Sequence, residues 1–131
     1  MTLWILAPVA ASAFALAATP ALAATPAPDL APTATDLALA MQRTAGPTSA
    51  VSLRCQPPQG THPNPSGACQ TLSTVNGNFD RLPHEQTMCT QIWDPVAVTA
   101  TGQWQGSPVR FTHSYDNPCL AAAETGGVFD F

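Results

Sequence analysis

The sequence predicts an α+β domain, in which a five-stranded antiparallel sheet packs with one longer and one short helix and carries two disulfides. Three observations support this prediction. Several stretches alternate apolar and polar residues, which is the period of a strand, and one stretch repeats apolar residues at helical spacing. The chain of 131 residues also contains four cysteines, an even number that is typical of disulfide pairs in a small exported domain.

Residues 1–23 have the features of a cleaved signal peptide. They carry no charged side chain and end in Ala21-Leu22-Ala23, a small-x-small site suited to signal peptidase. The usual basic start is missing, since the first arginine is Arg43. A transmembrane anchor is the alternative, and the short apolar run with its internal prolines Pro8 and Pro20 argues against it.

The rest of the chain divides into an arm and a domain. Residues 24–35 consist mostly of Ala, Pro and Thr, which predicts a flexible arm that buries too little apolar surface to fold. Residues 36–131 are expected to form the domain. We expect the protein to be secreted to the extracellular space, with no membrane attachment after the signal is removed.

Two strands are expected first, followed by the longer helix. The strands have the inward-facing residues Leu37, Leu39, Met41, Val51, Leu53 and Cys55, and a turn at 44–48 joins them. Ser66 is expected to cap the helix, and Asn76-Gly77 to end it. The apolar face of the helix is expected to be Ala68, Leu72, Val75 and Phe79.

Three more strands and the short helix are expected in the second half. One strand opens at Pro95, and a second follows a turn at 105–107. Their alternating residues are Val96, Val98 and Ala100, then Val109, Phe111, His113 and Tyr115. The short helix is expected over 120–124, and the fifth strand over 127–131. Trp104 is expected in the core or on a dimer surface, and Phe129 and Phe131 in the core.

Composition excludes several classes of function. A net charge of −4 without a basic patch argues against a nucleic-acid partner. None of the common catalytic or phosphate-binding motifs is present, and cysteines in disulfides cannot act as nucleophiles. A zinc site made from cysteines and His62, His84 and His113 would lack the usual ligand spacing. We therefore expect no enzyme activity, no metal and no cofactor.

The cysteines can pair in three ways, and sequence proximity favours Cys55–Cys69 and Cys89–Cys119. The second pair would fix one end of the stretch MCTQIWDP, residues 88–95, while Asp94-Pro95 restricts the other end. Between these ends the chain is expected to be extended and exposed. Such a loop loses little conformational freedom when it binds a partner, although an ordinary surface loop would have the same pattern.

Three stretches resemble the Streptomyces-type subtilisin inhibitors: the cysteine loop that ends in THPNPSGAC, the stretch MCTQIWDPVAVTATGQWQG, and the tail FTHSYDNPC…GGVFDF. The resemblance covers roughly residues 36–131. It implies a secreted inhibitor of serine proteases that forms a homodimer through its sheet, with the disulfide pairing already favoured. The partner implied is a subtilisin-like or related bacterial serine protease.

The resemblance also assigns site residues. The reactive bond is Gln91–Ile92, so Gln91 is the P1 residue, which enters the S1 pocket of the protease. The remaining protease-binding residues are Met88, Cys89, Thr90, Trp93 and Asp94. Asn117 matches an asparagine of the family that supports the loop from behind by hydrogen bonds, and a plain turn residue is the alternative. Trp93 either contacts the protease or packs on the body of the inhibitor.

Gln91 departs from the family pattern, since members commonly carry Met, Leu, Lys or Arg at P1. An uncharged P1 residue makes strong trypsin inhibition doubtful and favours a subtilisin-like target, with an apolar contact from Met88 at P4. Two alternatives remain. An exported binding or structural protein could use the same scaffold without inhibition, and Gln91 could serve as the glutamine donor for an extracellular transglutaminase.

Overall fold

The computed structural model describes residues 21–23 and 34–131, so most of the predicted signal peptide and arm lies outside the described residues. Within the described part, no helix has the length and apolar character needed to cross a membrane. The elements are β1 (Thr35–Arg43), β2 (Thr48–Cys55), α1 (Pro65–Thr74), the 3-10 helix η1 (Phe79–Arg81), β3 (Val96–Trp104), β4 (Ser107–Tyr115) and α2 (Pro118–Glu124).

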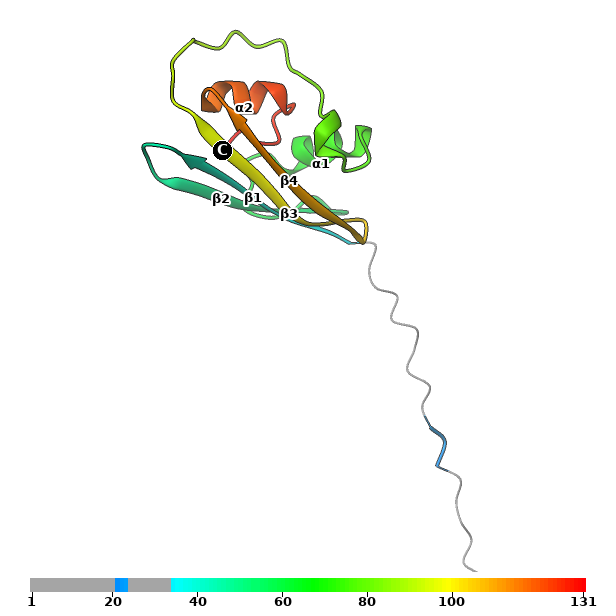
Figure 1. Cartoon of the computed structure of the whole chain (residues 1–131). Helices are drawn as coiled ribbons and strands as arrows, with labels where there is room; N and C mark the ends of the chain where they lie inside the picture. The colour runs from blue at the N-terminus through cyan, green and yellow to red at the C-terminus, as the bar shows by residue number, and fades with distance from the viewer. Residues whose placement is uncertain (1–20, 24–33) are drawn as a thin grey trace, which may run out of the picture.

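The architecture is α+β, as predicted, with two helices and two disulfides. The strands form one antiparallel sheet in the order β2-β1-β3-β4. Both helices lie on the same side of this sheet, and the chain between η1 and β3 arches over α2 (Figure 1). The described part of the chain therefore has two layers, and none of its helices lies on the second face of the sheet (Figure 1).

The prediction of five strands is wrong, because the sheet has four strands in the described part of the chain. Residues 125–129 form turns, and no strand is assigned to residues 127–131. The Val128 N–H bonds to the Thr125 carbonyl, and the Asp130 N–H bonds to the Gly127 carbonyl. Val128 and Phe129 are both fully buried. Their apolar character reflects burial in the core, which a turn can provide as well as a strand.

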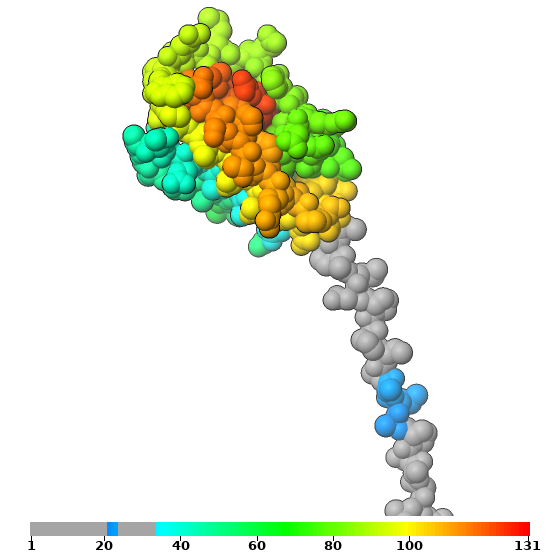
Figure 2. Space-filling view, in the orientation of Figure 1, coloured from blue at the N-terminus to red at the C-terminus, as the bar shows by residue number. Residues whose placement is uncertain are grey.

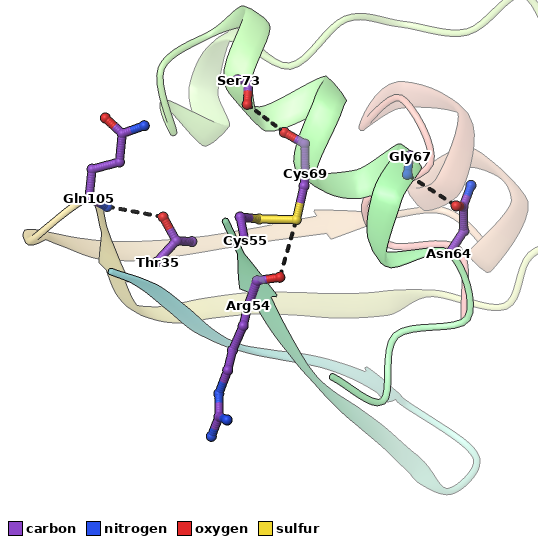
Figure 3. Close-up of a disulfide and its surroundings, with 8 residues drawn as sticks. All are labelled: Thr35, Arg54, Cys55, Asn64, Gly67, Cys69, Ser73 and Gln105. Atoms are coloured by element: carbon purple, nitrogen blue, oxygen red, sulfur yellow. Dashed lines mark hydrogen bonds between the residues drawn. A yellow bond between two sulfur atoms is a disulfide. The ribbon is translucent and has the colours of Figure 1, made fainter. Parts of the chain in front are cut away.

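The longer helix also begins and ends differently from the prediction. Its N-cap is Asn64, whose Oδ1 accepts a hydrogen bond of 3.0 Å from the Gly67 N–H, whereas Ser66 lies inside the helix (Figure 3). The helix ends at Thr74, and Phe79 belongs to η1. Phe79 is nevertheless buried, because the turn after the helix brings it back to the core.

The turn after α1 depends on two residues with left-handed backbone conformations, Asn76 (φ 52°) and Gly77 (φ 72°). A Cβ atom on Gly77 would lie 2.2 Å from the Trp104 ring, so only glycine fits there. Trp104 is buried, and its Nε1 donates to Asn76 Oδ1 at 3.3 Å. Of the two predicted places for Trp104, the core and a dimer surface, the structure shows the core.

The core lies between the inner face of the sheet and the helices. Phe129 is fully buried at its centre, and Phe131 is partly buried against it. The disulfide Cys55–Cys69 joins the end of β2 to α1 (Figure 3). The short helix α2 begins at Pro118, two residues before the predicted start, because Asn117 caps it.

Candidate functional site

The most exposed apolar side chains of the domain lie on one segment. Residues 82–95 connect η1 to β3 without helix or strand, and form the yellow-green projection at the top of the molecule (Figure 2). Met88 is 100% exposed, Trp93 is 74% exposed and Ile92 is 63% exposed. Exposed apolar residues grouped on a protruding loop indicate a surface that binds another protein.

The first half of this loop is fixed to α2. The Glu85 N–H donates to the Ala123 carbonyl at 2.7 Å, and the disulfide Cys89–Cys119 follows four residues later. Both predicted disulfide pairs are therefore present. In the chain-entropy account, closing a loop of this length stabilises the fold by about 3 to 4 kcal/mol.

Asn117 holds the middle of the loop from behind. Its Nδ2 donates to the carbonyl of Ile92 at 3.0 Å and to the carbonyl of Thr90 at 3.3 Å. Its Oδ1 accepts from the Leu120 N–H at 2.9 Å. Asn117 is 4% exposed, so these contacts are shielded from water. One buried amide thus binds the carbonyls on both sides of Gln91, which is itself exposed.

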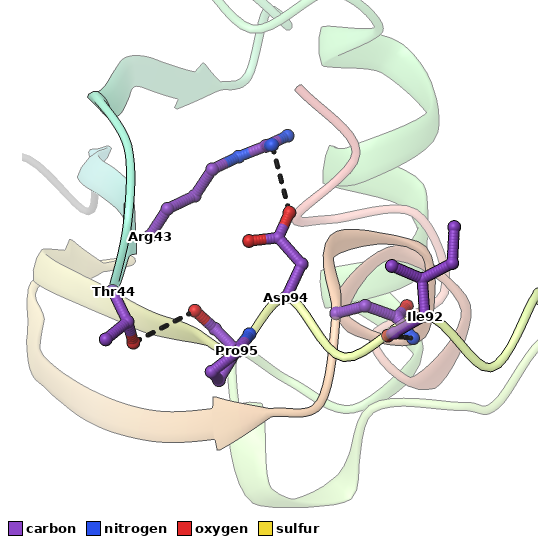
Figure 4. Close-up of polar contacts among 6 residues, drawn as sticks. Arg43, Thr44, Ile92, Asp94 and Pro95 are labelled. Atoms are coloured by element: carbon purple, nitrogen blue, oxygen red, sulfur yellow. Dashed lines mark hydrogen bonds and ion pairs between the residues drawn. The ribbon is translucent and has the colours of Figure 1, made fainter.

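The second half of the loop is held by polar contacts around Asp94. Arg43 Nη1 lies 3.0 Å from Asp94 Oδ2, and the Asp94 N–H donates to the Asp116 carbonyl at 2.9 Å (Figure 4). The Pro95 carbonyl accepts from the Thr44 N–H at 3.1 Å and from Thr44 Oγ1 at 3.2 Å. The end of β1 and the chain after it therefore hold the end of the loop.

A hollow of about 630 Å³ is lined by loop residues 87–93 together with Asp116, Asn117 and Leu120. The loop therefore stands away from the body and touches it at a few points. Its outward side chains, including Trp93, project into solvent, so Trp93 does not pack on the body. A partner can approach Met88, Gln91, Ile92 and Trp93 without displacing any part of the domain.

The central part of the loop, residues 86–93, is uncharged, and a tyrosine with a raised pKa lies near the base of the loop. Residues 86–93 contain no Asp, Glu, Lys or Arg. At the end of β4, burial raises the pKa of Tyr115 above 10.0, and the negative charge of Glu124 raises this pKa further. An uncharged loop is suited to an apolar or hydrogen-bonding partner surface more than to a strongly charged one.

His62 and His113 have different surroundings. His62 is buried, with Nδ1 accepting from the Asn64 N–H, so its Nε2 donates to the Val128 carbonyl. His113 is exposed and packs beside Phe111 and Tyr115. Within the described ranges, no three His, Cys, Asp or Glu side chains come together as metal ligands.

The structure brings the residues singled out from the sequence together on one loop and its support. Met88, Cys89, Thr90, Gln91, Ile92, Trp93 and Asp94 lie on the loop, and Asn117 lies behind it. Sequence reasoning missed Arg43 and Thr44, which are 51 positions from their partners. The only signal that could have found them is the strand register, which places Arg43 opposite Val96.

The chain is similar to several known proteins. The family model described as "Subtilisin inhibitor-like" matches residues 31–117. "Protease inhibitor SIL-V5" of Streptomyces luteoverticillatus is 50% identical over 91 residues, which is 67% of this chain and 84% of that protein. "Subtilisin inhibitor" of Streptomyces albogriseolus is 41% identical over 90 residues, 67% of this chain and 62% of that protein.

A solved structure is also similar. Sermetstatin of Streptomyces caespitosus, crystallised in complex with Bacillus licheniformis subtilisin, aligns with a TM-score of 0.59 and 28% identity. The alignment covers 75% of this chain and 99% of that chain. In that structure the matching fold is bound to subtilisin.

Proposed function

Because this chain belongs to the subtilisin inhibitor-like family, we propose that it inhibits a subtilisin-like serine protease by presenting the Gln91–Ile92 bond as a substrate. The observation that carries this proposal is the pair of hydrogen bonds from Asn117 to the carbonyls of Thr90 and Ile92, which flank that bond. A loop held in this way is ordered before binding and loses little entropy on association.

In this mechanism the protease supplies all the catalytic groups. The Gln91 carbonyl enters the oxyanion hole, and the catalytic serine attacks its carbon. Neither this carbonyl nor the Gln91 N–H takes part in a hydrogen bond within the described part of the chain. Both groups are therefore free to bond to the protease, as the backbone of a substrate would.

The same contacts explain how the loop would resist hydrolysis. If the bond is cut, Thr90 ends up on the acyl side and Ile92 on the amine side, and one Asn117 side chain holds both. The disulfide at Cys89 also retains the acyl side. The new amine therefore stays near the acyl-enzyme, where it can attack and reform the peptide bond faster than it departs.

Specificity in this proposal comes from the outward side chains. Gln91 at P1 has no charge to pair with the acid of a trypsin-type pocket, and its amide loses hydration in an apolar pocket. Met88 at P4 is fully exposed and suits an apolar subsite, while Trp93 offers a large apolar contact on the primed side. A subtilisin-like protease with broad apolar subsites fits this set best.

We also propose that the protein forms a homodimer through the open face of its sheet. One row across this face, from β2 to β4, is Ala50, Ala40, Thr99 and Thr112. These side chains are small and uncharged, so two copies of the face can approach closely without burying an unpaired charge. Secretion is part of the same proposal, since disulfides persist in oxidising compartments.

Titration of subtilisin activity with the oxidised domain tests the function, with mass spectrometry of the complex after long incubation. We expect stoichiometric inhibition and slow cleavage at Gln91–Ile92 alone. Rapid digestion of the domain at this loop would mean that the loop is an ordinary substrate, and would refute the proposal. A domain that survives intact without inhibiting would favour the non-inhibitory binding protein.

A further inference from the structure

We propose that Arg43 is a positioning residue that prolongs the life of the inhibitory complex by holding the amine half of the reactive bond through Asp94. This inference rests on the proposed function and deepens it. Arg43 does not touch the reactive bond. It contacts Asp94, which lies three positions after Gln91 in the sequence, on the side that would leave after cleavage.

The two halves of the loop are held in different ways. On the acyl side, a covalent disulfide at Cys89 lies two residues before Gln91. On the amine side no disulfide holds residues 92–95, and their recorded contacts are hydrogen bonds and one ion pair: Ile92 with Asn117, Asp94 with Asp116 and Arg43, and Pro95 with Thr44. Any loosening after cleavage is therefore expected on the amine side.

Arg43 is well placed to limit this loosening. It is the last residue of β1 and pairs with Val96 of β3, so its backbone is fixed beside the loop end. Its side chain points toward the Asp94 carboxylate, on the body side of the loop (Figure 4). The side chains of Arg43 and Asp94 are 43% and 31% exposed, so the ion pair is partly shielded from water and salt.

The expected effect concerns the rate of cleavage more than the rate of binding. Without Arg43, Pro95 still restricts the backbone of Asp94, and Asn117 still holds the carbonyls beside Gln91. The intact loop would keep its shape for the first encounter with the protease. After cleavage the amine would move away more often, so resealing would fall and net hydrolysis would rise.

The test compares Arg43→Gln with Arg54→Gln. Arg54 is a matched control because it also pairs with an aspartate, Asp36, at 3.6 Å, and belongs to β2, near the Cys55 end of the sheet. For each variant, the association rate is measured by stopped-flow inhibition of subtilisin, and cleavage at Gln91–Ile92 is followed by mass spectrometry. Both measurements are repeated at low salt and at high salt.

We expect Arg43→Gln to raise the cleavage rate about two- to fivefold at an unchanged association rate, as the loss of a partly exposed ion pair implies. The difference should shrink at high salt, and Arg43→Lys should restore part of the resistance. Arg54→Gln should behave as the wild type.

Equal cleavage rates for wild type and Arg43→Gln would overturn the role of Arg43. If Arg43→Gln changed the association rate as much as the cleavage rate, the role of Arg43 would also be overturned, because that result indicates a general change of loop shape. Thermal unfolding separates this role from simple stability, since the two glutamine variants should have similar melting temperatures. A wild-type protein that fails to inhibit would refute the proposed function itself, which is a distinct result.

Discussion

Asn117 Nδ2 lies 3.0 Å from the carbonyl oxygen of Ile92, and the same side chain caps α2 through Oδ1. The orientation of this amide is fixed, because its oxygen must face the Leu120 N–H and its nitrogen must face the loop carbonyls. Asn117 is buried, so its hydrogen bonds do not compete with water. The first turn of α2 and the shape of the loop therefore depend on one residue.

We expect Asn117→Asp to separate these two roles. Aspartate caps helices as well as asparagine does, so α2 should remain stable. A carboxylate cannot donate to the Thr90 and Ile92 carbonyls, and each lost hydrogen bond costs about 0.5 to 1.5 kcal/mol. Inhibition of subtilisin should weaken about tenfold, and cleavage at Gln91–Ile92 should accelerate, as measured by inhibition kinetics and mass spectrometry.

Asn117→Ala is the companion variant, because it loses the cap as well. We expect its free energy of unfolding to be lower by about 1 kcal/mol from the loss of the cap alone. If Asn117→Asp and the wild type resist cleavage equally, the amide does not support the loop during inhibition.

The two disulfides should have different effects when each is removed by a pair of alanine substitutions. Removing Cys89–Cys119 frees the acyl side of the loop, so this variant should be digested as a substrate. Removing Cys55–Cys69 should lower the free energy of unfolding by about 3 kcal/mol and leave inhibition intact below the melting temperature. Similar inhibition by both variants would show that the loop does not need its crosslink.

Gln91→Met should improve inhibition of subtilisin. Burying the glutamine amide in an apolar pocket costs roughly 1 to 3 kcal/mol, so the inhibition constant should fall about tenfold or more. Gln91→Lys should instead confer inhibition of trypsin, since it offers a cation to the acid of that pocket. Both variants change an exposed side chain, so thermal unfolding should be unaffected.

Gln91→Met also separates inhibition from the transglutaminase alternative. Glutamine-dependent incorporation of an amine at this site should disappear in the variant, while inhibition persists. If the variant loses both inhibition and amine incorporation, the assignment of Gln91 as an ordinary P1 residue is contradicted.

The open face of the sheet predicts how the dimer could be broken. Ala40→Glu places a charge in the centre of the row Ala50, Ala40, Thr99 and Thr112, where two copies would meet. Sedimentation should show a monomer for this variant and a dimer for the wild type. Inhibition should survive, because the loop lies at another part of the molecule. A wild-type monomer at micromolar concentration would refute the dimer.

The raised pKa of Tyr115 predicts how the stability of the domain changes at alkaline pH. Its pKa is raised by burial first and by Glu124 second, so the folded state holds the phenol proton more tightly than the unfolded chain does. This contribution to stability is present below pH 10 and is lost as the pH rises toward the raised value. Because the chain has one tyrosine, tyrosinate absorbance reports Tyr115 alone.

Glu124→Gln provides the control for this titration. It removes the smaller of the two causes, so the pKa of Tyr115 should move down toward 10.0 without reaching it. An unchanged titration curve would mean that burial alone raises the pKa.

Period and spacing predicted most of the fold, because buried side chains alternate with more exposed ones in β1, in the second half of β2 and in the first half of β3. In β4, Val109, Phe111 and Tyr115 are partly buried. The alternation of Leu37, Leu39 and Met41 is reproduced as full burial on one side of β1. The final residues misled the prediction, since Val128 and Phe129 are buried by their place in the core and not by pairing with a strand. Short apolar runs cannot distinguish these cases.

The loop was identifiable from the sequence, whereas part of its support was not. A cysteine and an Asp-Pro pair mark its ends, and both act through local chain restriction. The contact between Arg43 and Asp94 depends on the register of β1 against β3, which no local pattern encodes. Long-range polar contacts of this kind become visible only when the strand register is known.

The hollow behind the loop has a consequence for how this scaffold could change its target. Met88, Ile92 and Trp93 project into solvent, while the backbone that carries them is held by Asn117, Asp94 and the Cys89–Cys119 bridge. Substitutions at the projecting positions would therefore alter recognition with little effect on folding. Such a division allows new specificities to arise by single exchanges, without compensating changes in the core.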